Sequence, residues 1–354
     1  MTIDTNKLAH NGRALVGLCG ARGIGVSAVT KAFCAEAGMV AALAGAGFDY
    51  LADSRMENIG RYPAGILQRR MLIRLPAVSR AAEVVAGCDV SLNSEIAALA
   101  RLADAAEGAG RIHGIVLMLD LGDLREGIFY QDAKKIDAAV EYALGRRGLD
   151  LVGIGTNLTC YGGVLPAREN LGDLVNIGAD LRRRYGIDLP LISGGNSSSL
   201  YLLENGEMPD GITNLRLGEA ILCGHETGFR RHIGGLYQDV FRLSCEIIEI
   251  SEKPSMPIGR IVTNAFGEDI ADSFADMGLR RRAILAIGRQ DIDHGDIIAT
   301  APGIAIIGAS SDHLIIDISD SPQPLAVGDC LDFIPGYGSI LRAFSGRYIE
   351  RVYL

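Results

Sequence analysis

The chain has 354 residues, 22% of them charged, with a formal net charge of -9 at pH 7, and this acidic balance argues against a nucleic-acid partner. Its length exceeds one ordinary core, it has no apolar run long enough to cross a bilayer, and residues 1–6 lack the features of a signal peptide. The 7 cysteines show no CxxC spacing and His225-Glu226 is not part of HExxH, so we predict a cytoplasmic protein with free thiols and no metal site.

Strands and helices are predicted to alternate up to residue 224. Short apolar runs bounded by turns are typical of buried parallel strands, and apolar residues at helical spacing lie between them. The predicted strands cover residues 24–31, 48–52, 70–75, 89–92, 112–121, 149–156, 189–193 and 214–217. The predicted helices cover residues 6–19, 39–46, 94–109, 134–147, 168–185, 197–203 and 220–224.

Polar side chains stand at or just past the ends of these strands. They are Lys31, Ser54, Arg55, Arg74, Asn93, Asp120, Asn157, Gly194 to Ser197, and Arg216. The alternation would also fit an open, doubly wound sheet. A barrel, however, gathers all of these loops into one mouth, whereas an open sheet would spread them along an edge. We therefore predict an α/β fold with a (β/α)8 TIM barrel over residues 1–235.

The pattern changes near Leu236, and residues 236–354 are predicted to form an all-β domain. Turn residues separate its apolar runs. These predicted strands cover residues 241–250, 259–263, 282–286, 304–307, 314–318, 330–334 and 347–353. Residues 269–277 are the least regular part and are expected to form a loop or a short helix.

Lys31 ends the first predicted strand, just after the glycine-rich turn of residues 20–25. At the end of a buried strand the stem of a lysine lies among apolar walls, and desolvation lowers the pKa of its amine, as a Schiff-base lysine requires. The alternative is a surface lysine at a strand end. The glycines fit neither a P-loop, because Val26 stands where lysine is needed, nor GxGxxG.

Two segments predict an anion site. Gly194-Gly195-Asn196-Ser197 lies between a strand and a helix, where backbone N–H groups and a hydroxyl can converge on phosphate. An ordinary capped turn would use the same residues. A second such segment, Arg216-Leu-Gly218-Glu219, follows the next strand, and anion sites after strands seven and eight are typical of barrels.

Residues 120–127 place three carboxylates and one arginine after the longest predicted strand. Arg125 is the functional candidate, because a guanidinium in a barrel mouth can fix an oxygen of a cofactor ring. For Asp123 and Glu126 a salt-bridged surface turn is the alternative.

Two further segments lie in the predicted β domain. Asp312 and His313 are the only ionisable side chains between Ile307 and Leu314, although an exposed hairpin tip would have the same composition. Residues 333–338, which include Tyr337, are predicted to form a glycine-bounded turn.

These motifs occur together in an order that resembles alanine-racemase-like enzymes. The chain carries Lys31 on the first strand, Asp120-x-Gly-x-x-Arg125, Gly-Asn196-Ser197 and Arg216-x-Gly218. The resemblance covers nearly the whole chain and implies a fold-type III pyridoxal-phosphate enzyme, with a barrel followed by a β domain. Ala-Val-Thr-Lys31, Leu-Asn93-Ser-Glu95 and Leu-Gly122-Asp-Leu-Arg-Glu-Gly127 are most similar to the ornithine racemase branch.

The resemblance implies roles for several polar residues of the mouth. Lys31 would bind pyridoxal phosphate covalently and act as one of two bases. Arg125 would contact the phenolic oxygen, and Asn157 would lie against the ring, where relatives have a histidine. Arg216 would face the pyridine nitrogen; an arginine cannot accept a proton, so it opposes ring protonation and favours racemisation over decarboxylation.

By the same resemblance, the cofactor's phosphate is expected in the glycine-rich loops. Asn196 and Ser197 would contribute from the first loop, and the backbone of Gly218 and Glu219 from the second.

The second base departs from the family pattern. Alanine racemases take a tyrosine from the partner's β domain, but the matching stretch here carries Phe266, which cannot carry a proton. Related decarboxylases suggest that Asp312 holds the distal amine of the substrate. The second proton carrier stays open among Ser311, His313 and Tyr337, and an imidazole has the most suitable ordinary pKa.

We therefore predict a homodimeric, head-to-tail racemase of a basic amino acid, with ornithine first and lysine or arginine next. One alternative is a lyase similar to D-threonine aldolase or D-serine dehydratase. Those enzymes need a metal held by His and Cys, and Pro335 to Ser339 lacks both. The other alternative is a non-catalytic pyridoxal-phosphate carrier, in which residues 236–354 would be unexplained.

Overall fold

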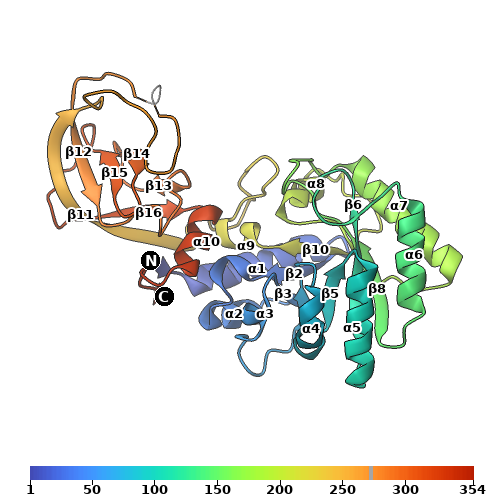
Figure 1. Ribbon diagram of the computed structural model, residues 1–354. Helices are drawn as coiled ribbons and strands as arrows, with labels where there is room; N and C mark the ends of the chain where they lie inside the picture. The colour runs from blue at the N-terminus through green and yellow to red at the C-terminus, as the bar shows by residue number, and fades with distance from the viewer. Residues whose placement is uncertain (271–273) are drawn as a thin grey trace. The chain divides into compact units, whose positions relative to one another are not determined.

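The computed structural model describes residues 1–270 and 274–354. The chain divides into two compact units, a barrel unit of Thr5–Val240 and a second unit that combines Met1–Asp4 with Phe241–Leu354 (Figure 1). The division therefore follows Val240 rather than residue 235, and the first four residues lie outside the barrel unit.

Eight parallel strands of the first unit close into a barrel, which confirms the predicted fold class and excludes the open sheet. The strands are β2 (Gly25–Val29), β3 (Tyr50–Asp53), β4 (Arg69–Leu72), β5 (Val90–Asn93), β6 (His113–Asp120), β8 (Leu149–Gly155), β9 (Leu191–Ser193) and β10 (Asn214–Leu217). Their order is β5-β4-β3-β2-β10-β9-β8-β6, and β5 also pairs with β6, which closes the ring. A two-residue strand, β7 (Ile128–Phe129), adds to β6 beside the mouth.

Helices connect these strands. They are α1 (Thr5–Gly20), α2 (Ala37–Ala44), α3 (Met56–Ile59), α4 (Ala81–Gly87), α5 (Ile96–Gly108), α6 (Ala133–Leu144), α7 (Arg168–Tyr185), α8 (Leu200–Glu204) and α9 (Glu219–Cys223), with the 3-10 turns η1 (Lys31–Phe33), η2 (Val78–Arg80) and η3 (Ser197–Ser199). The sequence pattern did not predict α3 and α4, which are too short to show helical periodicity.

The interior of the barrel is apolar along most of its wall. Alternate residues of successive strands, such as Val29, Met71 and Val116, form one buried cluster, as the period of two in β-strands requires. Buried polar side chains of β2, β9 and β10 form a separate hydrogen-bonded group. There the Asn214 amide donates to Ser27 Oγ at 3.0 Å and accepts from Ser193 Oγ at 2.8 Å.

His113, at the start of β6, is a buried histidine with a pH-dependent consequence for stability. Its Nε2 lies 2.8 Å from Ser91 Oγ, and burial lowers the pKa of the imidazole from 6.5 to about 4. Between these two pH values the unfolded chain binds a proton that the folded chain does not. The free energy of unfolding should therefore fall as the pH drops from 6.5 towards 4, by about 1.4 kcal/mol per pH unit at most.

His113→Gln should flatten this dependence, measured as urea midpoints at each pH, whereas exposed His10→Gln should keep it. Equal pH dependence of the His113 variant and the unmodified protein would contradict the prediction.

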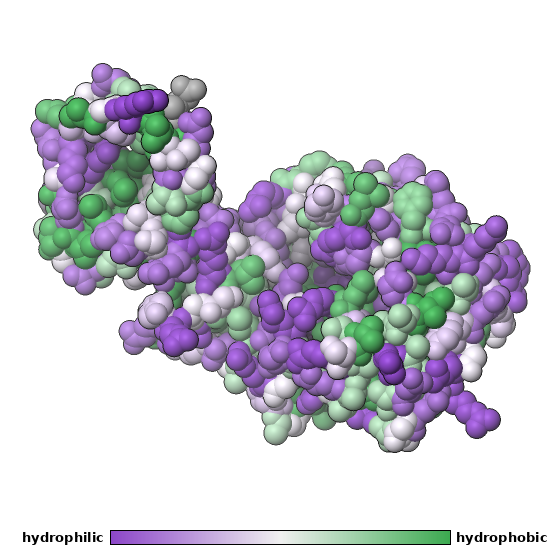
Figure 2. All heavy atoms as spheres, in the orientation of Figure 1, coloured by the Kyte–Doolittle hydropathy of each residue, from purple (hydrophilic) through white to green (hydrophobic). Residues whose placement is uncertain are grey.

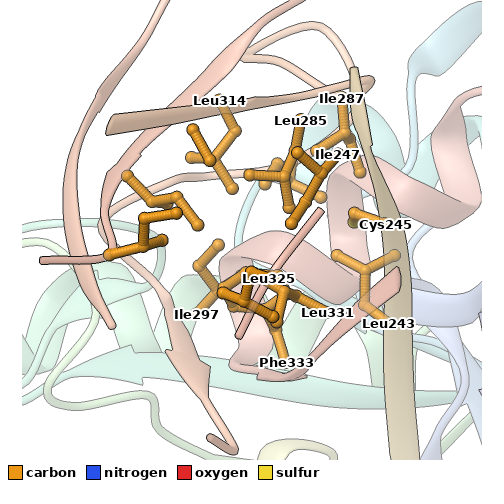
Figure 3. Packing of buried hydrophobic residues seen from close by; sticks show 14 residues of the cluster. Leu243, Cys245, Ile247, Leu285, Ile287, Ile297, Leu314, Leu325, Leu331 and Phe333 are labelled. Atoms are coloured by element: carbon orange, nitrogen blue, oxygen red, sulfur yellow. The ribbon is translucent and has the colours of Figure 1, made fainter. Parts of the chain in front are cut away.

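The second unit is built on a largely antiparallel sheet. Its strands are β11 (Phe241–Pro254), β12 (Leu279–Leu285), β13 (Ile297–Ala299), β14 (Ala305–Ala309), β15 (Leu314–Asp317) and β16 (Cys330–Pro335), joined by the terminal strands β1 (Thr2–Ile3) and β17 (Val352–Tyr353). The main order is β13-β16-β11-β12-β15-β14. Side chains such as Leu243, Ile247, Leu285, Leu314 and Phe333 point into one core (Figure 3).

The prediction of an all-β second domain is wrong in one respect, because Tyr337–Ser345 forms a helix, α10, where a turn was expected. The Asp296 carboxylate accepts hydrogen bonds from the backbone N–H groups of Gly338 (2.7 Å) and Ser339 (3.3 Å) at the start of α10. This cap comes from a residue 42 positions earlier, so no local sequence pattern could predict it.

Two predicted strands also need correction. Residues 259–263 form no strand and contribute only an isolated bridge from Thr263 to Asp269. Of residues 347–353 only Val352–Tyr353 is a strand. The irregular segment of residues 269–277 includes 271–273, which lie outside the described residues, and residues 274–277 form no helix or strand.

Hydrophobic residues are interspersed with hydrophilic ones over the face of the barrel unit that Figure 2 shows. Within the described ranges, none of the helices has both the length and the apolar character needed to span a bilayer.

Candidate active site

Lys31 lies just beyond β2 rather than inside it, because the strand ends at Val29 and Lys31 opens η1. The turn is completed by Cys34 and Ala35, which both adopt positive φ angles, 50° and 53°. Burial lowers the pKa of the Lys31 amine, and the nearby Arg125 guanidinium lowers it further, against the opposing effect of Cys160. Among the described residues the amine has no hydrogen-bond or ion-pair partner, so it is suited to act as a nucleophile.

A buried network of polar side chains holds Thr30, the residue before Lys31, in position. Thr30 Oγ1 donates to the Asp53 carboxylate at 2.6 Å and lies 2.9 Å from the Tyr62 hydroxyl. Asp53 also accepts from Asn58 Nδ2 at 3.0 Å. Burial raises the pKa of Asp53, although these hydrogen bonds oppose the shift. The network holds the backbone at Lys31, and no sequence motif predicted it.

Arg216, in β10, is buried with only 3% of its surface exposed. Its guanidinium donates to the Thr156 carbonyl oxygen at 2.6 Å, to Asn157 Oδ1 at 2.8 Å and to Ser193 Oγ. Burial lowers the pKa of Arg216 to about 10, so the group stays charged at neutral pH. Within the described chain it forms no salt bridge, and its charge is therefore available to a ligand.

Arg125 and Asn157 lie beside Arg216, as the sequence predicted for residues of one mouth. Both contact the Glu126 carboxylate, Arg125 through Nε and Nη2 and Asn157 through Nδ2 at 2.5 Å. Charges on Arg125, Glu126 and Cys160 influence the pKa of both Lys31 and Arg216. The structure thus brings these predicted cofactor residues close enough together that the charge of one changes the pKa of another.

Asp123 is not part of a salt-bridged surface turn, so that alternative is wrong for this residue. It is 1% exposed, and its carboxylate accepts backbone N–H groups of Tyr161 (2.9 Å), Val164 (3.1 Å) and Cys160 (3.3 Å). Burial alone would raise the pKa of Asp123, but these hydrogen bonds lower it below its ordinary value. Asp123 therefore fastens the loop after β8 to the loop after β6.

The two glycine-rich loops meet, as expected for one anion site. Ser197 Oγ accepts the backbone N–H of Ala220 at 3.2 Å, which joins η3 to the start of α9. Gly195 has a φ of 105°, and a Cβ on Gly218 would lie 3.3 Å from Val29 Cβ, so both positions favour glycine. Ser198 Oγ, in the same segment, is buried without a hydrogen-bond partner in the described chain.

The side chains of Asn196 and Glu219 form hydrogen bonds within the loops or next to them. Asn196 Oδ1 accepts the N–H of Ser198 at 2.8 Å, and its Nδ2 donates to the Leu158 carbonyl oxygen at 2.9 Å. The Asn196 side chain therefore caps its own turn, as the alternative interpretation of this segment predicted. Glu219 pairs with His225 at 2.9 Å. Contacts from these two residues to an anion would come from their backbone.

Comparison with known proteins decides the family of this barrel. A sequence profile described as "Alanine racemase, N-terminal domain" matches residues 3–225. The chain belongs to the alanine racemase family. This confirms the resemblance drawn from the motifs, together with the class of enzyme, a racemase, that it implied.

Relatives in this family match along the whole chain. An ornithine racemase of Acetoanaerobium sticklandii is 43% identical over 351 residues, which are 99% of this chain and 98% of that protein. A lysine racemase of Thermotoga maritima is 37% identical over 354 residues, 100% of this chain and 98% of that protein. The crystal structure of alanine racemase from Bartonella henselae with covalently bound pyridoxal phosphate shares the fold, with a TM-score of 0.72, 18% identity and coverage of 100% and 98%.

In the second unit the predicted residues Ser311, Asp312 and His313 lie together. The Asp312 carboxylate accepts from Ser311 Oγ at 3.1 Å and lies 3.0 Å from His313 Nδ1. These hydrogen bonds, from Ser311 first and then Ser310 and His313, lower the pKa of Asp312. Asp312 is therefore an exposed, ionised carboxylate at neutral pH, as recognition of an amine requires.

Arg289 links the other candidate segments of the second unit, a role that the sequence did not predict. Its guanidinium stacks over the Phe266 ring at 4.3 Å and pairs with Glu268 at 2.8 Å. Its backbone N–H donates to the Ser310 carbonyl at 2.9 Å, and its carbonyl accepts from Arg342 of α10 at 2.7 Å. The Phe266 segment, the Ser311 loop and the helix that begins with Tyr337 therefore all contact one residue, through its side chain or its backbone.

Proposed function

We propose that the chain is a pyridoxal-phosphate-dependent racemase that interconverts the L and D forms of a basic amino acid, most directly ornithine. The observation that carries the proposal is a desolvated lysine amine just past β2 and a buried guanidinium in the adjacent strand β10 that forms no salt bridge within the described residues. The full-length similarity to proteins named ornithine and lysine racemase supports the substrate class.

The residues present fit the cofactor of this family. The Lys31 amine and the buried hydroxyls of Ser198 and Thr156 have no partner among the described residues, and Gly218 leaves room beside Val29. Arg125 would hold the phenolic oxygen, Ser197 and the backbone at residues 218–219 the phosphate, and Arg216 the ring nitrogen.

When bound, pyridoxal phosphate withdraws electrons from the α-carbon of the amino acid and so makes its proton acidic. Lys31 would remove or return that proton on one face, helped by a pKa that burial has lowered. Arg216 would oppose protonation of the ring, because a guanidinium has no proton-accepting atom.

We propose that the second unit of a partner chain in a head-to-tail homodimer serves the opposite face. Asp312 would bind the distal amine of the substrate through its charge. His313, Ser311 and Tyr337 are the candidate carriers of the second proton, and Phe266 is excluded because a phenyl ring cannot carry a proton.

None of the seven cysteines forms a disulfide, which supports a cytoplasmic location.

Chiral chromatography after incubation of the cofactor-loaded protein with L-ornithine, L-lysine, L-arginine and L-alanine tests the function. We expect the D isomer to form fastest from ornithine and slowest from alanine. No D isomer from any of the four would overturn the racemase. In a parallel incubation with added metal, glycine formed from D-threonine or pyruvate formed from D-serine would favour a lyase, and bound cofactor without turnover on any of these substrates would favour a carrier.

Cys160 offers a direct test of where the cofactor binds. Its thiol is exposed and accepts a hydrogen bond from Asn196 Nδ2 at 3.4 Å. We expect alkylation of Cys160 by iodoacetamide to slow about tenfold when pyridoxal phosphate is present at roughly ten times its Kd. Exposed Cys330, in the second unit, is the internal control and should react at an unchanged rate in peptide mapping. Equal protection of both cysteines, or of neither, would contradict the proposed site.

A further inference from the structure

Glu126 occupies a position in the mouth that the function proposed above leaves without a role. Its side chain is 17% exposed and accepts hydrogen bonds from Arg125 Nε and Nη2 and from Asn157 Nδ2 at 2.5 Å. Burial alone would raise the pKa of Glu126, but Arg125 and Asn157 lower it below the ordinary value. The group is therefore an ionised carboxylate at neutral pH and is unsuited to donate a proton.

The orientation of the Asn157 amide depends on this carboxylate. An ionised carboxylate only accepts hydrogen bonds and a guanidinium only donates them. Asn157 lies between the two, with Nδ2 towards Glu126 and Oδ1 towards Arg216 Nη2 at 2.8 Å. Only one orientation of the amide satisfies both neighbours, so Glu126 determines which atom Asn157 presents to Arg216.

The hydrogen-bonded chain continues from Arg216 into the barrel. Arg216 Nη1 donates to Ser193 Oγ, which donates to Asn214 Oδ1 at 2.8 Å, and Asn214 Nδ2 donates to Ser27 Oγ at 3.0 Å. This hydrogen-bonded network thus runs from the loops after β6 and β8, through side chains of β10 and β9, to β2. Among the described residues Glu126 is the only carboxylate of this network, and its charge raises the pKa of Arg216.

We infer that Glu126 is a positioning residue that fixes Arg125 directly and Arg216 through the Asn157 amide, and so sets where both guanidinium groups meet the cofactor ring. This inference rests on the proposed function, because the two arginines are assigned to the cofactor there. Glu126 touches neither substrate nor cofactor in this scheme. It acts by holding two cations in place and by supplying the negative charge that they share.

Glu126→Gln removes the charge but keeps the shape. A Gln amide can donate to Asn157 and reverse its amide, which would turn a donor towards Arg216. We expect kcat for racemisation to fall about 10- to 100-fold, the range for loss of a charged hydrogen bond, with little change in KM. Glu126→Asp keeps the charge but is too short to hold both partners, and we expect a loss of about tenfold.

A second measurement uses the protein without cofactor. The Glu126 charge raises the pKa of Lys31, so in Glu126→Gln the pH profile for labelling of Lys31 by an amine reagent should shift to lower pH. In Glu126→Asp that profile should stay where it is. The matched control is Glu95→Gln, which removes an exposed carboxylate that follows β5 and pairs with Lys135 at 3.1 Å. This control should change neither kcat nor the Lys31 profile.

The outcomes separate this inference from the proposed function. If the unmodified protein neither binds pyridoxal phosphate nor racemises, the function fails, while the labelling profiles still test Glu126. If the unmodified protein is active and Glu126→Gln matches Glu95→Gln in kcat and in the Lys31 profile, the inference is overturned. Should Glu126→Gln not fold, an unchanged kcat in Glu126→Asp would overturn it equally.

Discussion

Lys31→Ala should abolish racemisation, with a loss of about 10⁴-fold or more, since it removes both the proposed covalent attachment and one of the two bases. The barrel should stay folded, because the Lys31 amine contributes no hydrogen bond or ion pair within the described residues. Lys31→Met keeps the apolar stem but removes the amine whose burial lowers its pKa. This variant should be at least as stable as the unmodified protein while having no activity.

Borohydride reduction followed by peptide mapping gives the measurement. The cofactor should be trapped on the peptide that contains residue 31 in the unmodified protein and on no peptide of the Lys31→Ala variant. Lys135→Ala is the matched control, because Lys135 is exposed, pairs with Glu95 and lies outside the proposed site. Trapping at another lysine, or an active Lys31→Ala variant, would show that the amine has been misassigned.

The sequence was sufficient to predict the barrel because its signals are local. Most of the eight strands are short, mainly apolar runs, and a polar residue that follows one of them, such as Asn157 after β8, must reach the mouth of any closed parallel barrel. Lys31, Arg125 and Arg216 could be singled out for the same reason. Their order along the chain also carried the family resemblance, which the profile match confirms.

What the sequence could not predict depends on contacts between distant segments. Thr30 and Asp53 are 23 positions apart, and Glu126 and Asn157 are 31 apart, so no pattern within one element reveals that they meet. The cap of α10 by Asp296 is of the same kind. Glu126 in particular looks like a surface residue in the sequence, since charged turns are common, and only its burial and its partners identify it.

Arg216→Glu should lower racemisation about a thousandfold, because it places a carboxylate where the chain offers hydrogen-bond acceptors. The Thr156 carbonyl oxygen, 2.6 Å from the guanidinium, cannot reorient and would face the new negative charge. Ser193 and Asn157 could turn donors towards it, but the Asn157 amide would then lose its hydrogen bond to Glu126. Arg216→Lys keeps the charge without the fork of donors, and we expect a smaller loss of about 10- to 100-fold.

The two variants should also differ in what they produce. If the charge of Arg216 opposes protonation of the cofactor ring, a carboxylate at this position should favour it, and loss of the α-carboxyl group should then compete with racemisation. The ratio of decarboxylated amine to D-ornithine, measured by chromatography, should therefore rise in Arg216→Glu and stay low in Arg216→Lys. Arg13→Glu, a charge reversal at an exposed arginine of the outer helix α1, controls for the change in net charge. If Arg216→Glu racemises within about tenfold of the unmodified protein and forms no new product, the guanidinium stabilises the barrel but has no role in the reaction.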